Sequence, residues 1–158
     1  MIFVSVGTHP QQFNRLLEEI DHLIIKNKIN ERVIAQTGNS TYLPKNYKTK
    51  KFMGLEEFDK NIKNCSIFIT HAGEGNIGTG LQFEKRMVVV PRLKKCGEHT
   101  NDHQLELAEA IKKQKQAIVC EVNEIELALK KVKKLKLKKT EHAKGIINLI
   151  EKYAEQKN

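Results

Sequence analysis

The sequence predicts an α/β protein built on a parallel sheet of about six strands, with helices on both faces. Short apolar runs of strand length alternate with longer segments in which apolar residues recur at helical spacing. The short runs are apolar at nearly every position, which is typical of strands that are buried on both faces. The chain of 158 residues has the length of one typical domain, so we expect a single domain over 1–158.

The first half of the chain is expected to form three strands and two helices. Strands are predicted where β-branched and apolar residues cluster, and helices where apolar residues recur every three to four positions. One long segment is polar, rich in turn residues and without a period, which indicates a loop. In order, the predictions are a strand at 2–6, a helix at 13–26, a strand at 32–37, a loop at 38–50, a strand at 51–54 and a helix at 55–64.

The second half opens with a strand at 65–70 that runs into a stretch of glycines. Four glycines fall within eight positions, in a chain that has only nine, and we expect a glycine loop at 71–80 with a helix beginning in LQFEKR. The remaining predictions are a strand at 87–91 that Pro91 ends, a helix from about 101, a strand at 117–122 and basic helices over about 123–156.

The chain is strongly basic, with a formal net charge of +9. Seven lysines in the segment 130–139 supply much of this excess, opposite an apolar stripe of Ile125, Ala128, Leu129, Val132 and Leu135. A solvated helix face is the ordinary explanation for these lysines, and attraction to an anionic membrane surface is the alternative. The sequence holds no Trp and no recognised RNA-binding motif, so we expect no nucleic-acid partner.

Cysteine spacing and terminal sequence bear on the compartment. Cys65, Cys96 and Cys120 are odd in number, far apart and outside any CxxC pair, which indicates neither a disulfide framework nor a metal site. The opening segment 1–6 lacks the basic start and long apolar core of a signal peptide. We therefore expect a cytoplasmic protein that binds no metal and reaches a membrane only through another protein.

Ligands in an open parallel sheet bind beyond the carboxyl ends of the strands. Four polar segments fall at those ends: the loop that begins at Gly7, the turn around Gln36 and Gly38, the 71–80 stretch and the segment after Pro91. A strand, a glycine turn and a helix start together favour an anion, because free backbone N–H groups and the helix dipole attract negative charge. The sequence therefore predicts a phosphate-binding crevice.

One phosphate ligand to consider is a dinucleotide, because GEGNIG at 73–78 fits the pattern GxGxxG. In a dinucleotide fold this pattern belongs in the first strand-to-helix turn, with an acidic residue about 20 positions later. Here the first turn reads GTHPQQ, and the strand after the glycines ends at Pro91 and Arg92 without an acid. Arg92 would suit a 2′-phosphate, but the dinucleotide interpretation ranks below the one that follows.

Three motifs in a fixed order resemble the nucleotide-sugar half of glycosyltransferase family 28: HAGEGN after a strand, then VVVPR, then GEHTNDHQLELAEAI. The opening MIFVSVGTHPQQFNRLLEEID is similar to the N-terminus of the small catalytic subunits of two-component transferases, from the dolichol-pathway UDP-GlcNAc transferase to bacterial exopolysaccharide relatives. The resemblance covers nearly the whole chain. It implies a Rossmann-like domain equivalent to the C-terminal half of a GT-B glycosyltransferase.

The resemblance also implies an activity and partners. It implies an enzyme, the donor-binding catalytic subunit of an inverting transferase that moves a hexose from a UDP-sugar to a lipid-linked saccharide acceptor, without a cofactor. A membrane-associated subunit would supply the acceptor side and recruit this chain to the inner face of the membrane. The alternative is a non-catalytic subunit that retains the fold and stabilises such a transferase.

The glycine-rich motif carries the predicted diphosphate site. By resemblance, His71 lies beside the donor diphosphate, where a cation or N–H donor stabilises the departing UDP. A core histidine that only caps a strand is the simpler alternative for His71. Gly73 and Gly75 would provide a backbone cradle for phosphate, and Asn76 an amide donor. Together these residues predict the catalytic and phosphate-binding part of the site.

Other loops supply the remaining predicted contacts. His103 and Gln104 match a pair that contacts donor-sugar hydroxyls, although an exposed helix start explains His103 about equally well. Glu98 and His99 would either hold their loop or touch the sugar. In the first loop, the backbone of Gly7 and Thr8 would reach the diphosphate, while His9 would face the acceptor as a catalytic base unless the partner supplies that base.

The uridine end of the predicted site is less complete. The segment 52–54 would offer backbone groups to the uracil, with core packing of Phe52 as the simpler alternative. The family commonly has a carboxylate at position 79, where it grips the ribose hydroxyls, whereas this chain has Thr79. Either Thr79 or Glu84 takes over that contact, or nucleotide binding differs, and this departure is the best support for a non-catalytic subunit.

Overall fold

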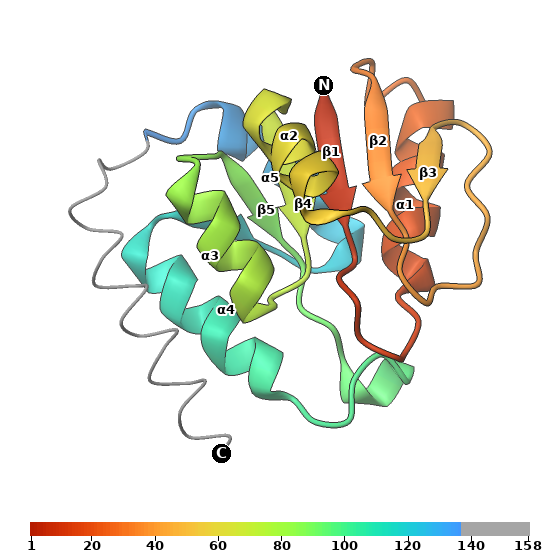
Figure 1. Cartoon of the computed structure of the whole chain (residues 1–158). Helices are drawn as coiled ribbons and strands as arrows, with labels where there is room; N and C mark the ends of the chain where they lie inside the picture. Colours follow the sequence, from red (N-terminus) through yellow and green to blue (C-terminus); the bar gives the residue numbers. More distant parts are fainter. Residues whose placement is uncertain (137–158) are drawn as a thin grey trace.

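The structure is a computed structural model that describes residues 1–136, so residues 137–158 of the predicted basic helices lie outside it. Six parallel strands form one sheet in the order β3-β2-β1-β4-β5-β6, which confirms the predicted α/β fold (Figure 1). The strands are β1 (Ile2–Ser5), β2 (Val33–Gln36), β3 (Lys48–Lys50), β4 (Ile67–Thr70), β5 (Met87–Val89) and β6 (Ala117–Val119).

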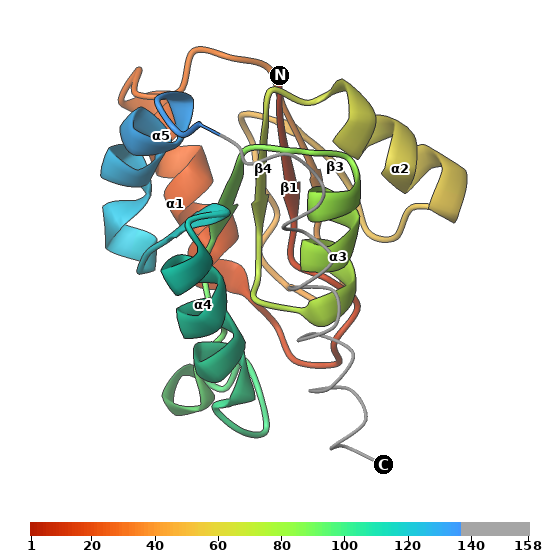
Figure 2. The same ribbon diagram turned by 90° about the vertical axis from the view of Figure 1, so that its left-hand side faces the viewer.

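Helices cover both faces of the sheet, and alternate strand residues pack against each layer (Figure 2). In β1, Ile2 and Val4 join the core on one face, whereas Phe3 joins the core on the other. The first face is covered by α1 (Asn14–Ile25) and α5 (Ile125–Lys133). The second is covered by α2 (Leu55–Asn64), α3 (Glu74–Gln82) and α4 (His103–Gln114). Two short 3-10 turns lie at Lys94–Cys96 and Val122–Glu124.

The third strand lies three residues earlier than the sequence predicts. It occupies Lys48–Lys50 instead of 51–54, and it pairs with β2 at the edge of the sheet. All three of its residues are exposed, so no apolar pattern marks it as a strand. Phe52, just after it, is 43% exposed, which contradicts the expectation that it packs in the core.

The glycine stretch is mostly helix, and the expected loop at 71–80 is wrong. Helix α3 begins at Glu74, with Gly73 as its N-cap, so the later glycines lie inside the helix. At Gly80 a glycine is needed inside the helix, because a Cβ atom there would lie 2.3 Å from Sδ of buried Met87. Close packing of the helix on the sheet therefore overrides the low helix propensity of glycine.

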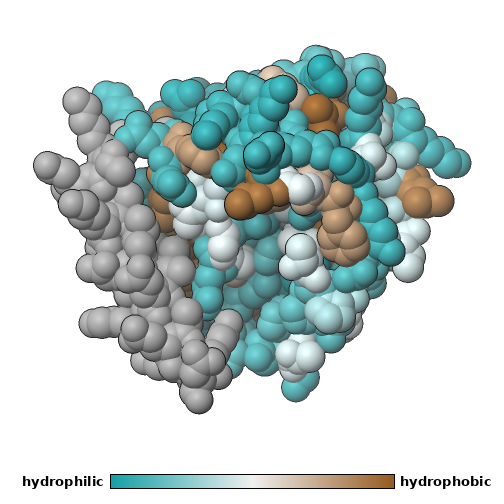
Figure 3. All heavy atoms as spheres, in the orientation of Figure 1, coloured by the Kyte–Doolittle hydropathy of each residue, from teal (hydrophilic) through white to brown (hydrophobic). Residues whose placement is uncertain are grey.

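The surface in the view of Figure 3 is mainly hydrophilic, with separate apolar residues between polar ones. The predicted apolar stripe is confirmed, since Ile125, Ala128, Leu129 and Val132 of α5 are buried in the core and Leu135, just after the helix, packs against it partly buried. The lysines of α5 are exposed on its other side. In the described part of the chain, residues 1–136, no helix combines the length and the apolar character needed to cross a membrane.

Candidate functional site

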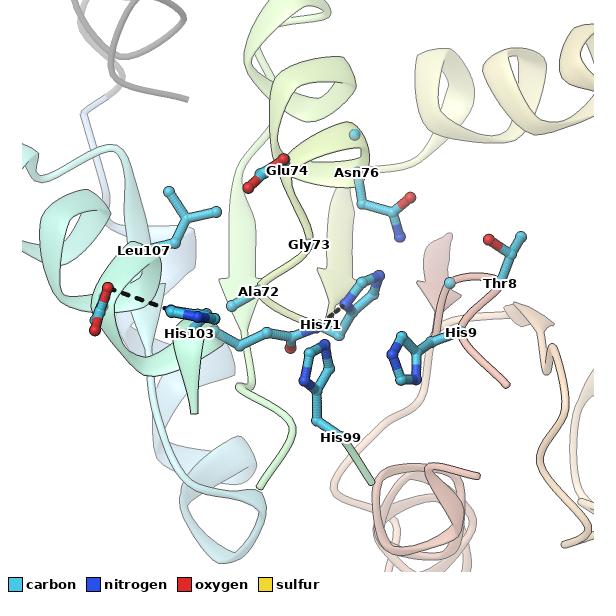
Figure 4. Close-up of a pocket in the computed structure, with 14 residues that line it drawn as sticks. Thr8, His9, His71, Ala72, Gly73, Glu74, Asn76, His99, His103 and Leu107 are labelled. Carbon is cyan, nitrogen blue, oxygen red and sulfur yellow. Dashed lines mark hydrogen bonds and ion pairs between the residues drawn. The ribbon is translucent and has the colours of Figure 1, made fainter. Parts of the chain in front are cut away.

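A cavity of about 460 Å³ lies at the carboxyl end of the sheet (Figure 4). It falls where the strand order reverses, because the chain proceeds from β1 toward β2 on one side and from β4 toward β5 on the other. This switch point is where open α/β sheets bind ligands, and the volume suits a small molecule. The predicted site residues that line the cavity are Gly7, Thr8, His9, His71, Gly73, Gly75, Asn76, His99, His103 and Gln104.

The imidazole of His71 is held between two glycines. His71 follows β4 directly and is only 8% exposed. A Cβ atom on Gly7 would lie 2.3 Å from Nε2 of this ring, and a Cβ atom on Gly73 would lie 2.0 Å from its Cε1. Gly7 also has a φ of 78°, which side-chain-bearing residues rarely adopt. Bare backbone is therefore needed at both positions to admit the ring.

A hydrogen-bond chain fixes the protonation state of His71. The Arg92 backbone N–H donates to Oε1 of Gln104 at 3.0 Å, so the Gln104 amide nitrogen faces Nδ1 of His71, also at 3.0 Å. Nδ1 then accepts this hydrogen bond, which assigns the ring proton to Nε2. Burial, and then the charge of Arg92, lower the pKa of His71 to about 3. Of the two forms considered for His71, a cation or an N–H donor, the structure therefore favours the neutral N–H donor.

The N-terminus of α3 faces the cavity beside His71. Its N-cap, Gly73, offers no side chain to the first turn, and Glu74, Gly75 and Asn76 of that turn all line the cavity. The first backbone N–H groups of a helix have no intrahelical acceptor and carry the positive end of the helix dipole. Helix α4 begins on the opposite side at His103, whose N–H donates to Oδ1 of Asn101. The arrangement favours an anionic ligand.

Asn76 lies in the first turn of α3, but its amide hydrogens serve the protein. Nδ2 donates to Oγ of Ser5 at 3.0 Å and to Oγ1 of Thr70 at 2.8 Å. Asn76 thereby joins the ends of β1 and β4 under the cavity. Its backbone N–H remains at the helix start, whereas the side-chain amide that we expected to donate to phosphate is occupied.

Two further histidines stack beside His71, as Figure 4 shows. The rings of His9 and His99 lie 4.3 Å apart between centroids, with an angle of 20° between their planes. Burial, followed by the neighbouring His99 and Arg92, lowers the pKa of His9, so this ring is neutral at neutral pH. Nδ1 of His9 is buried without a hydrogen-bond partner among residues 1–136, and Nδ1 of His99 accepts the Asn101 N–H.

Two predicted site residues do not line the cavity. Glu98 is 1% exposed, and its carboxylate forms a forked pair with Arg15, with O–N distances of 2.5 and 2.9 Å. It also accepts a hydrogen bond from the Leu93 N–H. Of the two roles expected for Glu98, holding its loop or touching the sugar, the structure therefore supports the first. Thr79 donates from Oγ1 to the Gly75 carbonyl one turn earlier, at 2.8 Å. Glu84, its proposed substitute, does not line the cavity either.

Several features were not predicted from the sequence. Glu74 and Glu106 bring carboxylates to the cavity wall, and Oε2 of Glu106 lies 3.6 Å from Nδ1 of His103 (Figure 4). Arg92 is completely buried, which excludes the 2′-phosphate contact considered for it. The residue type gave the opposite signal, because arginine is seldom fully buried. Among the described residues 1–136, no three His, Cys, Asp or Glu side chains are grouped so as to hold a metal ion.

Comparisons with known proteins agree with this architecture. The chain is 28% identical over 169 aligned residues to the UDP-N-acetylglucosamine--N-acetylmuramyl-(pentapeptide) pyrophosphoryl-undecaprenol N-acetylglucosamine transferase of Prochlorococcus marinus (strain MIT 9312), covering 100% of this chain and 44% of that protein. It is 30% identical over 128 residues to the human UDP-N-acetylglucosamine transferase subunit ALG13, covering 75% of this chain and 11% of that protein. The chain thus spans less than half the length of these relatives.

Solved structures agree on the fold. The crystal structure of the glycosyltransferase of kitacinnamycin matches with a TM-score of 0.62 and 17% identity, over 95% of this chain and 38% of that one. A model of the glycosyltransferase family 28 C-terminal domain matches residues 1–156, which is nearly the entire sequence. The cavity at the switch point, the motifs around it and this match lead to one conclusion: the chain belongs to the glycosyltransferase family 28 C-terminal domain family.

Proposed function

We propose that this chain is the donor-binding, catalytic half of a two-component inverting glycosyltransferase. It binds a UDP-sugar and moves the hexose to a lipid-linked acceptor in polysaccharide or glycan synthesis. The observation that carries the proposal is the convergence of the His71 ring and the N-terminus of α3 at the switch-point cavity. Membership of the family supports it, because the matched domain is the C-terminal one of glycosyltransferases.

The chemistry requires a site that stabilises a departing diphosphate. In an inverting transfer, an acceptor hydroxyl attacks the anomeric carbon while the bond from that carbon to the β-phosphate oxygen breaks. Negative charge then develops on the UDP, and the first N–H groups of α3 together with the Nε2–H of His71 would stabilise it. A neutral His71 stays a donor throughout the reaction. No proton has to move to the leaving group.

The acceptor hydroxyl must lose its proton to a base. His9 is suited to this role because it lines the cavity and is neutral at neutral pH. A base on the partner subunit is the alternative. Both routes leave UDP as the product and invert the configuration at the anomeric carbon.

A partner completes the proposed enzyme. The chain spans less than half of its curated relatives, and one of these is itself named as a subunit. We therefore propose a membrane-associated acceptor-side subunit that recruits this cytoplasmic chain to the inner face of the membrane. The exposed lysines of α5 would add attraction to anionic lipid, at roughly 1 kcal/mol for each lysine near the surface.

Calorimetric titration with UDP tests the donor site without requiring the partner. We expect saturable heat for the wild type and an affinity at least about tenfold weaker for His71→Ala, because one hydrogen bond to a charged group is lost. His22→Ala is the matched control, since this exposed histidine lies in the last turn of α1, outside the cavity. Absence of saturable UDP binding to the folded wild type would refute the donor site.

The second candidate is a non-catalytic stabilising subunit. The observation that favours it is Thr79, which donates to its own helix where the family commonly has a carboxylate. Co-expression with the acceptor-side subunit separates the two functions. A catalytic half loses turnover of UDP-sugar in His71→Ala while the complex persists, whereas a stabilising subunit retains turnover in the same variant.

A further inference from the structure

We propose that Arg92 is a positioning residue whose buried guanidinium clamps the loops that carry His9 and His99, so that these two rings stack at the cavity. Arg92 does not line the cavity and lies behind it, in the core. The effect on donor binding rests on the function proposed above. The effect on ring positions does not depend on that function.

The guanidinium of Arg92 donates four hydrogen bonds to backbone carbonyls in three segments. Nη1 donates to Gln11, Gln12 and Glu98 at 2.9, 3.0 and 2.9 Å, and Nη2 donates to Val6 at 2.6 Å. The acceptors belong to the end of β1, the loop at 7–12 and the loop at 93–102. One side chain therefore holds two loops that are more than eighty residues apart in the sequence.

The clamp lies next to both stacked rings in the sequence. His9 is two residues before Gln11, and His99 directly follows Glu98. The backbone N–H of Arg92 also donates to Gln104, which fixes the His71 ring. Arg92 is thus hydrogen-bonded to the loops that carry His9 and His99 and, through Gln104, to the ring of His71.

A fully buried cation is costly unless hydrogen bonds compensate it. The carboxylate of Glu98 forms its ion pair with Arg15, whereas Arg92 contacts only the backbone carbonyl of Glu98. Arg92 and Arg15 also both lie over the ring of Phe13, at 5.0 and 5.2 Å from its centroid. A planar group with five donors can reach carbonyls that diverge in this way, and a lysine ammonium cannot. The geometry of the loops therefore accounts for an arginine here.

Arg92→Lys tests the clamp, because it retains the charge and loses the fork. Side-chain NMR of the histidines reports the stack, since each ring shifts the proton resonances of the ring above it. We expect Arg92→Lys to abolish these shifts for His9 and His99 and to weaken UDP binding about tenfold or more. Asp21→Asn is the control, because Asp21 is also buried and accepts four hydrogen bonds, from Tyr42, Lys45 and Asn46, away from the cavity.

The control separates positioning from general stability. Asp21→Asn should lower the melting temperature and leave the histidine resonances and UDP affinity unchanged. Unchanged ring shifts in folded Arg92→Lys would overturn the proposal, as would equal changes in the Asp21→Asn control. Arg92→Gln, which is neutral and shorter, replaces the lysine variant if that does not fold. If neither variant folds, Arg92 is a core residue and the proposal is wrong.

The same experiment distinguishes failure of the clamp from failure of the donor site. Loss of the ring shifts in Arg92→Lys, together with no UDP binding by the wild type, would support the clamp and refute the donor site. Retained shifts together with UDP binding by the wild type would refute the clamp alone.

Discussion

Substituting two glycines of α3, its N-cap Gly73 and the internal Gly78, gives the sharpest test of the His71 site. A Cβ atom at Gly73 would lie 2.0 Å from Cε1 and 2.6 Å from Nε2 of His71, and the ring cannot retreat because Gly7 closes its other side. Gly78 lies in the same helix, and nothing lies within 4 Å of its added Cβ. A methyl group added by alanine would therefore clash with the His71 ring at position 73 and meet open space at position 78, five residues later.

The two substitutions should change stability in opposite directions. Overpacking at Gly73 costs about 1–3 kcal/mol, and Gly78→Ala gains up to about 1 kcal/mol because alanine is the better helix former. The variants should thus differ by about 1–4 kcal/mol in free energy of unfolding, which separates their melting temperatures by roughly 2–16 °C.

Urea unfolding and calorimetric titration with UDP measure both consequences. Gly73→Ala should lose UDP binding because it displaces the His71 ring and fills the N-terminus of α3, whereas Gly78→Ala should bind as the wild type does. Equal stability and equal UDP affinity in the two variants would show that the space around His71 adapts freely. That result would refute the tight enclosure on which the site's chemistry depends.

Three further predictions concern single side chains. The pKa of His71 is lowered to about 3 in the folded protein, so between pH 6.5 and 3 the unfolded chain binds a proton at His71 and the folded protein does not. The free energy of unfolding is therefore highest above pH 6.5 and falls as the pH drops below it. In urea unfolding at pH 7 and pH 5, the wild type should lose about 2 kcal/mol more of this free energy than His71→Ala. Thr79→Glu should strengthen binding of UDP by roughly threefold to tenfold but not of 2′-deoxy-UDP, measured by calorimetry, if a carboxylate at this position meets the ribose. Burial raises the pKa of the Cys65 thiol to about 11 and of Cys120 to about 12, so mass spectrometry after iodoacetamide treatment of the native protein should find alkylation at exposed Cys96 and none at the other two.

The sequence predicted those elements whose apolar pattern reflects burial. Strands β1, β2, β4, β5 and β6 were each predicted within three residues of their ends, because their side chains are mostly buried. Strand β3 was misplaced, since an edge strand with three exposed residues carries no such pattern. The start of α3 was also misplaced, because the close approach of Gly80 to Met87 is a tertiary contact that no local rule contains.

The lining of the cavity was predicted where residues lie in loops at the strand ends, and was missed where a side chain's partners lie in the interior. His9 and His71 follow strand ends, His99 precedes α4 and His103 begins it, so topology alone brings them to one edge. The inward orientation of Glu98 toward Arg15 depends on a partner far away in the sequence. The role of Arg92 could not be read from the chain either, because its four acceptors are backbone carbonyls, which leave no trace in residue identity.

The narrow space around the His71 ring also depends on the register between β1 and β4. β1 and β4 are neighbours, so the bare backbone of Gly7 meets the ring only when the two strands are paired in their native register. A slip by one residue would bring the side chain of Val6 or Thr8 to that place and expel the imidazole. The ring therefore fits only when the two strands are in their native register, and a misaligned sheet would lack the cavity that the ring completes.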